Sequence, residues 1–324
     1  MKHWSNRPRV VFALSIMLGT SGLFAAPETA TFRASEPEEI AKGSYFGQPP
    51  PGEIPIPFAP AFLSAHYSFV ARIAFSPDGN ECFFTVTDAT FSRPQILQTR
   101  RQGDAWSTPV VAPFTQNHVK SNEPFFSPDG NRLYFSSDED GKSPTNRRDI
   151  WRVERTPEGW SHLQRLPSPL NSGYTELFFS QSADGTAYFI SNRPGGLGGF
   201  DLYRSFSLPD QTVRVEHLDA PLNSSADEWD PCIAPDGRFL VFCSTRPGGL
   251  GGSDLYLSFT DGHGGWMPPV NLGEGFNSAA DEYAPSLSPD GRFLFFTRHD
   301  GKRGELYWVR TSALERFRVR PNQT

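Results

Sequence analysis

The feature of this chain that most restricts its fold is a short turn motif that recurs five times at a nearly constant spacing. The motif reads Ser-Pro-Asp-Gly or a close variant, and its aspartates are Asp78, Asp129, Asp184, Asp236 and Asp290. Successive aspartates lie 51, 55, 52 and 54 positions apart. A repeat of about 50 residues is typical of propellers and other repeat architectures, because each copy is one supersecondary unit.

Each copy has the same order of strand-like runs around its turn. In the fourth copy, residues 231–234 precede the Asp-Gly turn and residues 239–243 follow it. Asp-Gly between two such runs predicts a hairpin, since glycine tolerates the positive φ of a tight turn. A third run follows a loop, as at 254–256, and a fourth begins near a tryptophan in three copies. Four antiparallel strands per repeat predict a propeller blade.

The ends of the chain indicate how the ring closes. The fifth copy lacks a clear fourth strand, whereas residues 56–62, ahead of the first turn, resemble the fourth strand of the first copy at 110–114. Because a ring must join its ends or leave an open sheet edge, we expect residues 56–62 to complete the last blade. The predicted fold class is all-β: a five-bladed β-propeller of four-stranded antiparallel blades, closed by an N-terminal strand. Six blades are the alternative, which would need a degenerate blade.

The first 26 residues read as a signal peptide. A basic start precedes an apolar run at 10–24, and the small residues Ala25 and Ala26 follow it. The pattern predicts export to the periplasm or secretion; an uncleaved anchor is the alternative, although the run is short for a spanning helix. The expected organisation is then signal peptide 1–26, linker 27–52, propeller 53–312 and C-terminal tail 313–324.

Composition limits the possible partners. The formal net charge is −6, and no basic stripe with interleaved aromatic residues occurs, so a nucleic-acid partner is not expected. The three cysteines, Cys82, Cys232 and Cys243, cannot all pair within one chain. Cys232 and Cys243 flank one predicted hairpin and could approach each other; alternatively, all three are buried small apolar residues.

Two further repeated segments accompany the turns. Residues 193–199 and 246–252 both read Arg-Pro-Gly-Gly-Leu-Gly-Gly, and residues 223–228 and 277–282 both read Asn-Ser-x-Ala-Asp-Glu. Together with the Ser-Pro-Asp-Gly turns, these motifs resemble the WD-repeat-like propeller repeat of the TolB family, over nearly all of the chain after the signal peptide. Related repeats occur in periplasmic envelope proteins, next to peptidoglycan-binding domains and in peptidase propellers. The chain departs from TolB in lacking a separate N-terminal domain, so the resemblance does not extend to a role in the Tol system.

Strand order places chemically diverse residues on one face. If the Asp-Gly turns lie at the bottom, the 193–199 and 246–252 loops and the segments that link successive blades lie at the top. The first strand of each blade is innermost, so its start lines the mouth of the channel. The ligand-binding residues predicted on this top rim are Arg72, Glu123, Glu176, Arg193, Glu228, Trp229, Asp230, Arg246, Glu282, Tyr283 and Arg298. Arg72 comes from the first copy of the repeat, which lacks the glutamate found near the start of the first strand in the other copies.

The top rim has two interpretations. A mixed-charge funnel could hold a peptide, a sugar or a cation, and ringed carboxylates with asparagine oxygens would suit calcium. Residues repeated in every blade, however, usually serve the blade: Arg193 and Asp201 flank one loop and could pair across it, as could their equivalents in the next blade. Trp229 and Tyr283 could stack on a sugar or peptide, or pack in the core.

Familiar catalytic motifs do not occur in the sequence after the signal peptide. There is no Gly-x-Ser-x-Gly, no His-Glu-x-x-His and no phosphate-binding Gly-x-x-x-x-Gly-Lys. The sequence therefore predicts a non-catalytic, monomeric binding propeller without a stable membrane anchor, whose top rim binds an envelope protein, a peptide or a glycan. No cofactor is evident, although calcium could bind. The alternative is a hydrolase or lyase acting on carbohydrate or lactone, with rim carboxylates as acid and base and a requirement for calcium in one version.

Overall fold

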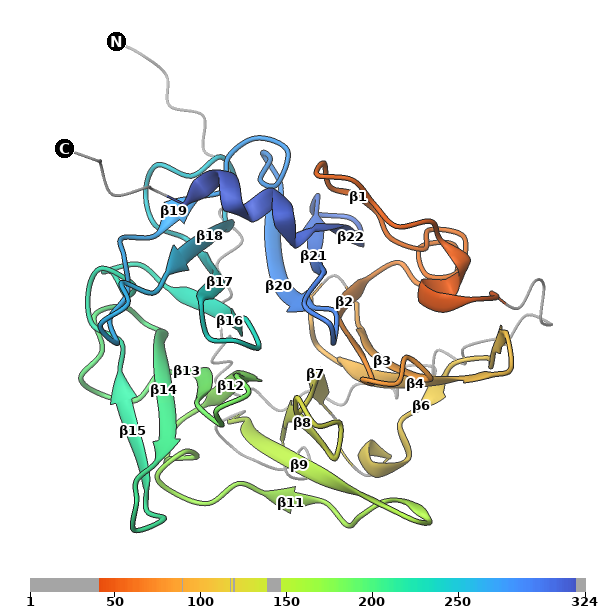
Figure 1. Ribbon diagram of the computed structural model, residues 1–324, viewed down its shortest axis with the longest axis horizontal. Helices are drawn as coiled ribbons and strands as arrows, with labels where there is room; N and C mark the ends of the chain where they lie inside the picture. The colour runs from red at the N-terminus through yellow and green to blue at the C-terminus, as the bar shows by residue number, and fades with distance from the viewer. Residues whose placement is uncertain (1–40, 89, 117, 119, 139–146, 319–324) are drawn as a thin grey trace, which may run out of the picture.

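The computed structural model describes residues 41–88, 90–116, 118, 120–138 and 147–318, which form a ring of five antiparallel sheets (Figure 1). The predicted five-bladed β-propeller is confirmed. The predicted signal peptide lies outside the described residues. Within the described part of the chain, no helix has the length and apolar character needed to cross a membrane.

Each blade runs from an inner strand to an outer one. Blade 1 contains β2 (Val70–Phe75), β3 (Glu81–Val86), β4 (Gln95–Gln102), β5 (Ala105–Trp106) and β6 (Val110–Val111). Blade 2 contains β7 (Ser121–Phe126), β8 (Arg132–Ser137), β9 (Asp149–Thr156), β10 (Gly159–Trp160) and β11 (Gln164–Arg165). Blade 3 contains β12 (Glu176–Gln181), β13 (Ala187–Ser191), β14 (Asp201–Ser207) and β15 (Val213–His217). Blade 4 contains β16 (Glu228–Ile233), β17 (Phe239–Ser244), β18 (Asp254–Phe259) and β19 (Val270–Asn271).

Blade 5 closes the ring as the sequence predicts. It contains β20 (Asp281–Leu287), β21 (Phe293–His299), β22 (Gly304–Arg310) and, as its outermost strand, the N-terminal β1 (Ile56–Pro57). Ile56 lies opposite Trp308, and the backbone N–H of Phe58 donates to the carbonyl of Leu306 at 2.7 Å. The closing strand is shorter than the expected 56–62, because Ala59 has a φ of 44° and the chain turns there.

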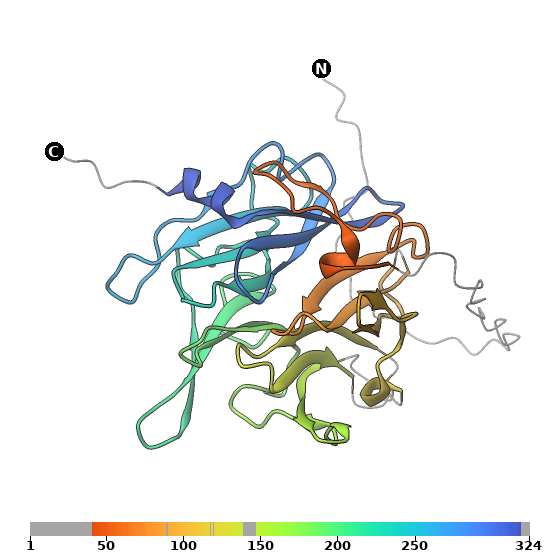
Figure 2. The same ribbon diagram turned by 45° about the vertical axis from the view of Figure 1, so that its right-hand side comes forward.

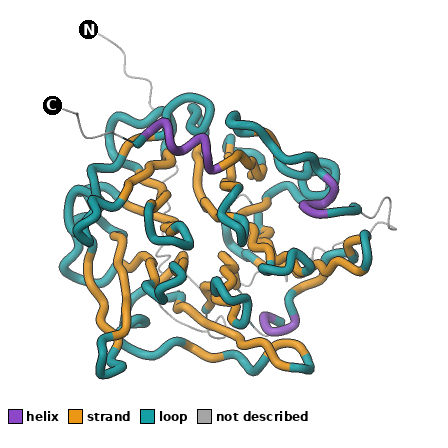
Figure 3. The backbone as a smooth tube through the Cα atoms, in the orientation of Figure 1, coloured by secondary structure: helices purple, strands orange, loops and turns teal. Residues whose placement is uncertain are grey.

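The packed unit extends beyond the expected propeller bounds at both ends. Within the expected linker, the 3-10 helix η1 (Ser44–Gly47) packs on blade 1, where Trp106 donates its indole N–H to the carbonyl of Gly43 at 2.8 Å. At the other end, η3 (Thr311–Phe317) buries Ala313 and Leu314. Helix is confined to these and one other short segment, η2 (Pro113–Thr115), among the residues described (Figure 3). Apolar side chains in these flanking segments therefore cover sheet surface that the repeats alone leave open.

The blades pack face to face, so most strand residues are buried on both sides. All six residues of β17 are buried, for example, and both Cys232 and Cys243 lie in the core that joins blades 3, 4 and 5. Both cysteines, and Cys82 as well, are free thiols, so the hairpin that Cys232 and Cys243 flank has no disulfide. The Asp-Gly turns are held as expected: Asp78 accepts the backbone N–H of Asn80 at 3.0 Å.

The innermost strands β2, β7, β12, β16 and β20 surround the centre of the ring (Figure 1). Each is interrupted by a register shift at the same point, which is the signature of a β-bulge. The bulged residue has positive φ in every case: Arg72, Glu123, Phe178, Asp230 and Ala284. A bulge re-aims one side chain relative to its strand. The five bulges thus form an axial ring in which the side chains differ from blade to blade.

Candidate functional site

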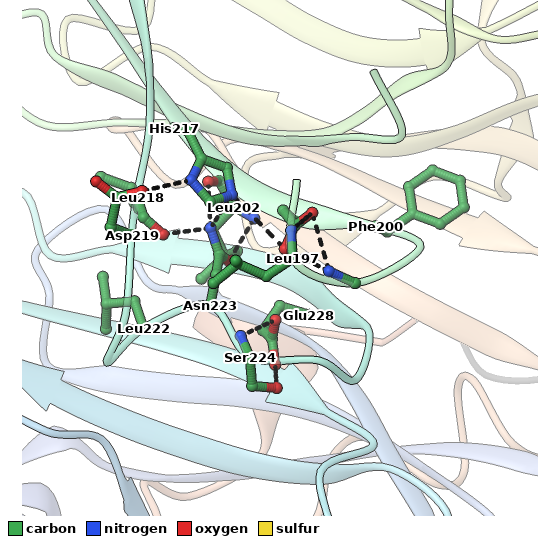
Figure 4. Close-up of polar contacts among 12 residues, drawn as sticks. Leu197, Phe200, Leu202, His217, Leu218, Asp219, Leu222, Asn223, Ser224 and Glu228 are labelled. Atoms are coloured by element: carbon green, nitrogen blue, oxygen red, sulfur yellow. Dashed lines mark hydrogen bonds and ion pairs between the residues drawn. The ribbon is translucent and has the colours of Figure 1, made fainter. Parts of the chain in front are cut away.

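The side chain of the glutamate that opens β16 is held by groups of its own blade and of the segment that leads into it. Glu228 is fully buried and accepts the backbone N–H of Ser224 at 2.9 Å and the Ser224 hydroxyl at 2.7 Å (Figure 4). The hydroxyl of Ser244 and the guanidinium of Arg246 each donate to Oε1 at 2.9 Å. Both carboxylate oxygens are therefore occupied by donors from the surrounding loop and strand.

An Arg–Glu pair occurs in blades 3, 4 and 5, although in blade 5 Arg298 lies directly opposite Glu282, where blades 3 and 4 have a serine. Arg193 contacts Glu176 at 3.1 Å and Arg298 contacts Glu282 at 2.7 Å, again with a fully buried carboxylate. We call Glu176–Arg193, Glu228–Arg246 and Glu282–Arg298 the Arg–Glu clamps. Removing one member of a buried ion pair leaves an uncompensated charge, so the clamps stabilise their blades. Six of the predicted rim residues lie in them, and ligand binding by these six stays a prediction.

Arg193 does not pair with Asp201, and Arg246 does not pair with Asp254, so the pairing expected across each loop is wrong. Asp201 instead accepts the backbone N–H groups of Leu197 and Gly198, at 3.0 and 3.1 Å. In blade 4, Asp254 accepts those of Leu250 and Gly251, at 2.6 and 3.0 Å. A carboxylate acceptor at the base of each loop fixes its backbone, because charge-assisted hydrogen bonds are stronger than neutral ones.

The 246–252 loop is also fixed from its far side. A Cβ atom on Gly251 would lie 1.8 Å from the carbonyl oxygen of Ala280, so the loop backbone lies directly against the segment that leads into blade 5. The side-chain amide of Asn277 bonds both backbone groups of Leu255, at 2.8 and 3.0 Å, as Asn223 does with Leu202 (Figure 4). These asparagines extend the hydrogen bonding of the third strands, β14 and β18.

Glu123 does not belong to the same set as the clamp glutamates, although the sequence suggested that it did. In the pairing of β7 with β8, Ser121 lies opposite Ser137, just as Glu228 lies opposite Ser244 in blade 4. Ser121 is therefore the equivalent of Glu228, and Glu123 stands two positions later, at the bulge. The predicted rim residues separate into the clamps and an axial group.

The axial group consists of Arg72, Glu123 and Asp230, all buried. Arg72 donates from Nη2 to the carbonyl of Phe179 in blade 3, at 3.2 Å, so its side chain crosses the centre of the ring. Among the described residues, its Nε and Nη1 have no hydrogen-bond partner, and neither has Oδ1 of Asp230. Glu123 accepts the backbone N–H of Phe178 at 3.2 Å. We call these three side chains the axial charge cluster.

The two carboxyl groups share this enclosed space with the Arg72 guanidinium, and the charge of Arg148 also acts on Glu123. Burial raises the pKa of Glu123 to about 8; the positive charges of Arg148 and Arg72 oppose the rise, and the nearby Asp230 adds to it. Burial likewise raises the pKa of Asp230 to about 6, with Arg72 opposing. Desolvation penalises the charged form of a carboxyl group, and a second carboxylate nearby penalises it further. The axial charge cluster therefore retains a proton near neutral pH.

Trp229 and Tyr283 lie in the core rather than at an open mouth. Both are buried, and the Trp229 ring contacts Phe200 with centroids 4.3 Å apart. The Tyr283 ring lies near Phe69 and Phe91, at 6.3 and 5.9 Å. Their placement matches the core-packing interpretation of these two positions.

The opposite end of the axis has a small apolar cavity of about 70 Å³. The prolines that precede the Asp-Gly turns surround it: Pro77, Pro128, Pro235 and Pro289. Sequence reasoning missed this cavity because the turn prolines read only as turn formers. The part of the chain that the structure describes contains no group of three or more His, Cys, Asp or Glu residues placed to hold a metal ion.

No protein-family model and no curated protein matches this chain. Solved structures do. A protein assigned as TolB from Agrobacterium tumefaciens is 18% identical, with a TM-score of 0.50 over 76% of this chain and 78% of that one. TolB from Acinetobacter baumannii is 18% identical, with a TM-score of 0.47 over 74% of this chain and 54% of its own. A thermostable family-43 glycoside hydrolase is 11% identical, with a TM-score of 0.49 over 74% and 88%. The likeness to the A. tumefaciens protein shows the propeller fold alone.

Proposed function

We propose that this protein is a non-catalytic, exported binding propeller that recognises another protein through its top rim. The observation that carries the proposal is the pair of leucines at the tips of the two Arg-Pro-Gly-Gly-Leu-Gly-Gly loops. Leu197 is 51% exposed and Leu250 is 45% exposed, although the backbone on both sides of each is fixed by hydrogen bonds to aspartates. Apolar side chains on a preorganised backbone are suited to anchor a protein partner, because little conformational entropy is lost on binding.

The exposed leucines have a third apolar neighbour on the same rim. Tyr174 is 46% exposed and precedes the clamp glutamate of blade 3, so it lies in the segment that links blades 2 and 3. Complete burial of a fully exposed leucine contributes about 1.5–3 kcal/mol, so burial of the exposed half of each leucine would contribute roughly 1 kcal/mol. Three anchors on adjacent blades would therefore supply the centre of a protein interface, with the polar loop backbone as its rim.

The ionisable residues of the rim favour binding over catalysis. Each clamp carboxylate already accepts several hydrogen bonds inside its blade, and the axial carboxyl groups are enclosed. A general acid or base must reach a substrate proton within hydrogen-bond distance. Export is part of the proposal and rests on the predicted signal peptide. Calcium binding stays a prediction, which metal analysis of the purified protein can test.

Site-specific photocrosslinking tests the proposal in the cells that produce the protein. A photoreactive amino acid at position 197 or 250 should give one discrete heavier species. Val213, which is 41% exposed on the outer strand β15, is the matched control position and should give none. The double variant Leu197→Asp/Leu250→Asp should fold normally and lose the species captured from a probe at position 174.

Two results would contradict the proposal. Equal crosslinking at Val213 and at the loop leucines would show that no specific interface lies on the top rim. Turnover of a glycan or lactone by the purified protein, lost on substitution of a rim carboxylate, would favour the hydrolase or lyase alternative.

A further inference from the structure

The three tryptophans that follow the third strands have different surroundings. Trp106 is covered by the N-terminal segment, where its indole N–H donates to Gly43. Trp160 packs among Phe83, Phe114 and Phe126, with the Arg155 guanidinium 4.5 Å from its ring centroid. The N-terminal segment therefore buries Trp106, whereas Trp160 is half-buried and packs against three phenylalanine rings of blades 1 and 2.

Trp266 occupies the same repeat position in blade 4 but borders open space. It is half-buried, and one edge contacts Tyr188 of blade 3 with ring centroids 5.9 Å apart. Trp266 borders two adjoining hollows of about 640 and about 560 Å³. Arg204, Gly264 and Trp266 line both hollows. We call the two hollows together the blade 3–4 groove. Their volumes fall within the range of small-molecule sites, about 300–1,000 Å³.

The outer hairpin of blade 3 forms one wall of the groove. β14 and β15 project outward from the ring as a long ribbon (Figures 1 and 2). The opposite wall is the 261–266 loop of blade 4. Arg204 connects the walls, because its Nη1 lies 3.5 Å from the carbonyl of Gly264. The groove therefore has an aromatic side, a guanidinium at its centre and walls from two blades.

Charges in the groove are largely paired. Arg204 contacts Glu216 at 2.8 Å, and Arg214 contacts the other oxygen of Glu216 at 2.9 Å. His217 lies 2.9 Å from Asp219. The remaining charged lining residues are the acids Asp184, Asp236 and Asp261. An anionic ligand would meet net negative charge here, whereas a ligand rich in neutral hydroxyl groups would find both donors and acceptors.

We infer that the blade 3–4 groove binds a neutral oligosaccharide, with one sugar face stacked on Trp266 and its hydroxyls hydrogen-bonded by Arg204 and the groove carboxylates. Aromatic rings with one apolar face next to polar groups suit such amphipathic ligands. The polar walls supply the few oriented groups that fix a ligand's position. The groove is on the outer edge of the ring and is independent of the top-rim leucines.

Isothermal titration calorimetry with cellotetraose, maltotetraose and chitotetraose tests the inference. At least one should bind the wild-type protein, and Trp266→Ala should weaken binding by about tenfold or more, which corresponds to about 1.4 kcal/mol. Trp266→Phe should restore part of the affinity, and Arg204→Gln should weaken it without loss of fold. These two variants keep the test valid if Trp266→Ala is unstable.

Tyr174→Ala is the matched control, since it removes an exposed aromatic ring from the top rim and should bind sugar as the wild type does. Leu197→Asp/Leu250→Asp should also bind sugar normally, which separates this inference from the proposed protein interface. The inference is overturned if none of the three sugars binds at millimolar concentration, or if Trp266→Ala and Arg204→Gln bind as the wild type does. Binding of tetragalacturonate alone would equally overturn it, because that ligand is anionic.

Discussion

Replacing Glu228 with alanine should destabilise the propeller rather than simply weaken a ligand site. The substitution removes a fully buried carboxylate and leaves the Ser224 and Ser244 hydroxyls and the Arg246 guanidinium without their shared acceptor. Breaking a buried ion pair costs about 3–5 kcal/mol. The Arg246 side chain is 15% exposed and keeps some hydration, so we expect the lower end of this range, about 3 kcal/mol.

Thermal unfolding followed by circular dichroism measures this effect. In a domain of this size 1 kcal/mol shifts Tm by about 2 °C, because the entropy of unfolding grows with chain length, so Glu228→Ala should lower Tm by about 5 °C. Glu228→Gln retains a side-chain oxygen for the serines and should lose less. Glu158→Ala, at an exposed turn residue, is the control and should stay within about 0.5 kcal/mol of the wild type. A wild-type Tm for Glu228→Ala, together with lost partner binding, would refute the structural role of the clamp.

Three further measurements test other parts of the structure. Because the pKa of Glu123 is raised to about 8, the folded state holds a proton that the unfolded state has lost, and the free energy of unfolding of the wild type should fall as the pH rises from 4.5 to about 8. Glu123→Gln should remove this pH dependence of stability, as urea unfolding across that range would show. An unchanged pH profile would contradict a buried, protonated Glu123. Gly251→Ala should cost about 1–3 kcal/mol through its clash with the Ala280 carbonyl, and a neutral effect on Tm would contradict the close loop contact. Thiol labelling should detect no cysteine until denaturant is added, since all three are buried; rapid labelling of the native protein would contradict this.

Much of the fold could be predicted because the same pattern of strands and turns occurs five times in the sequence. The Asp-Gly turns give the hairpins, and the short fifth copy gives the closing partner for residues 56–62. The length of the closing strand could not be read in the same way, since it ends at the positive φ of Ala59, a residue with no turn signature. The packing of η1 on blade 1 was equally hidden, because it depends on Trp106 being left uncovered by its own blade.

The candidate site was harder to predict because the charged residues that recur in several blades are not the residues that are exposed for binding. The clamp residues repeat, and their repetition made them conspicuous as a ring of charge. The structure shows that each arginine and glutamate satisfies its neighbour, so that most of the recurring charge is internal to a blade. Leu197 and Leu250 were visible in the sequence as part of the loop motif. Their exposure, however, follows from contacts of the flanking backbone that no local pattern reports.

The misplacement of Glu123 shows why the axial charge cluster escaped prediction. Aligning the copies by their acids puts Glu123 with Glu228, whereas the strand register puts it with Asp230. The spacing to the Asp-Gly turn distinguishes the two positions: Glu123 precedes Asp129 by 6 residues, as Asp230 precedes Asp236, whereas Glu228 precedes Asp236 by 8. The bulge itself occurs at the same point of each inner strand and does not require a particular side chain. The other bulged residues are as unlike as Arg72 and Ala284, and their surroundings differ: Arg72 crosses the centre of the ring, whereas the Phe178 ring contacts Trp229 of blade 4. Bulge positions, where the fold of the blade does not require one residue type, are therefore positions at which a propeller can carry residues specific to its own function.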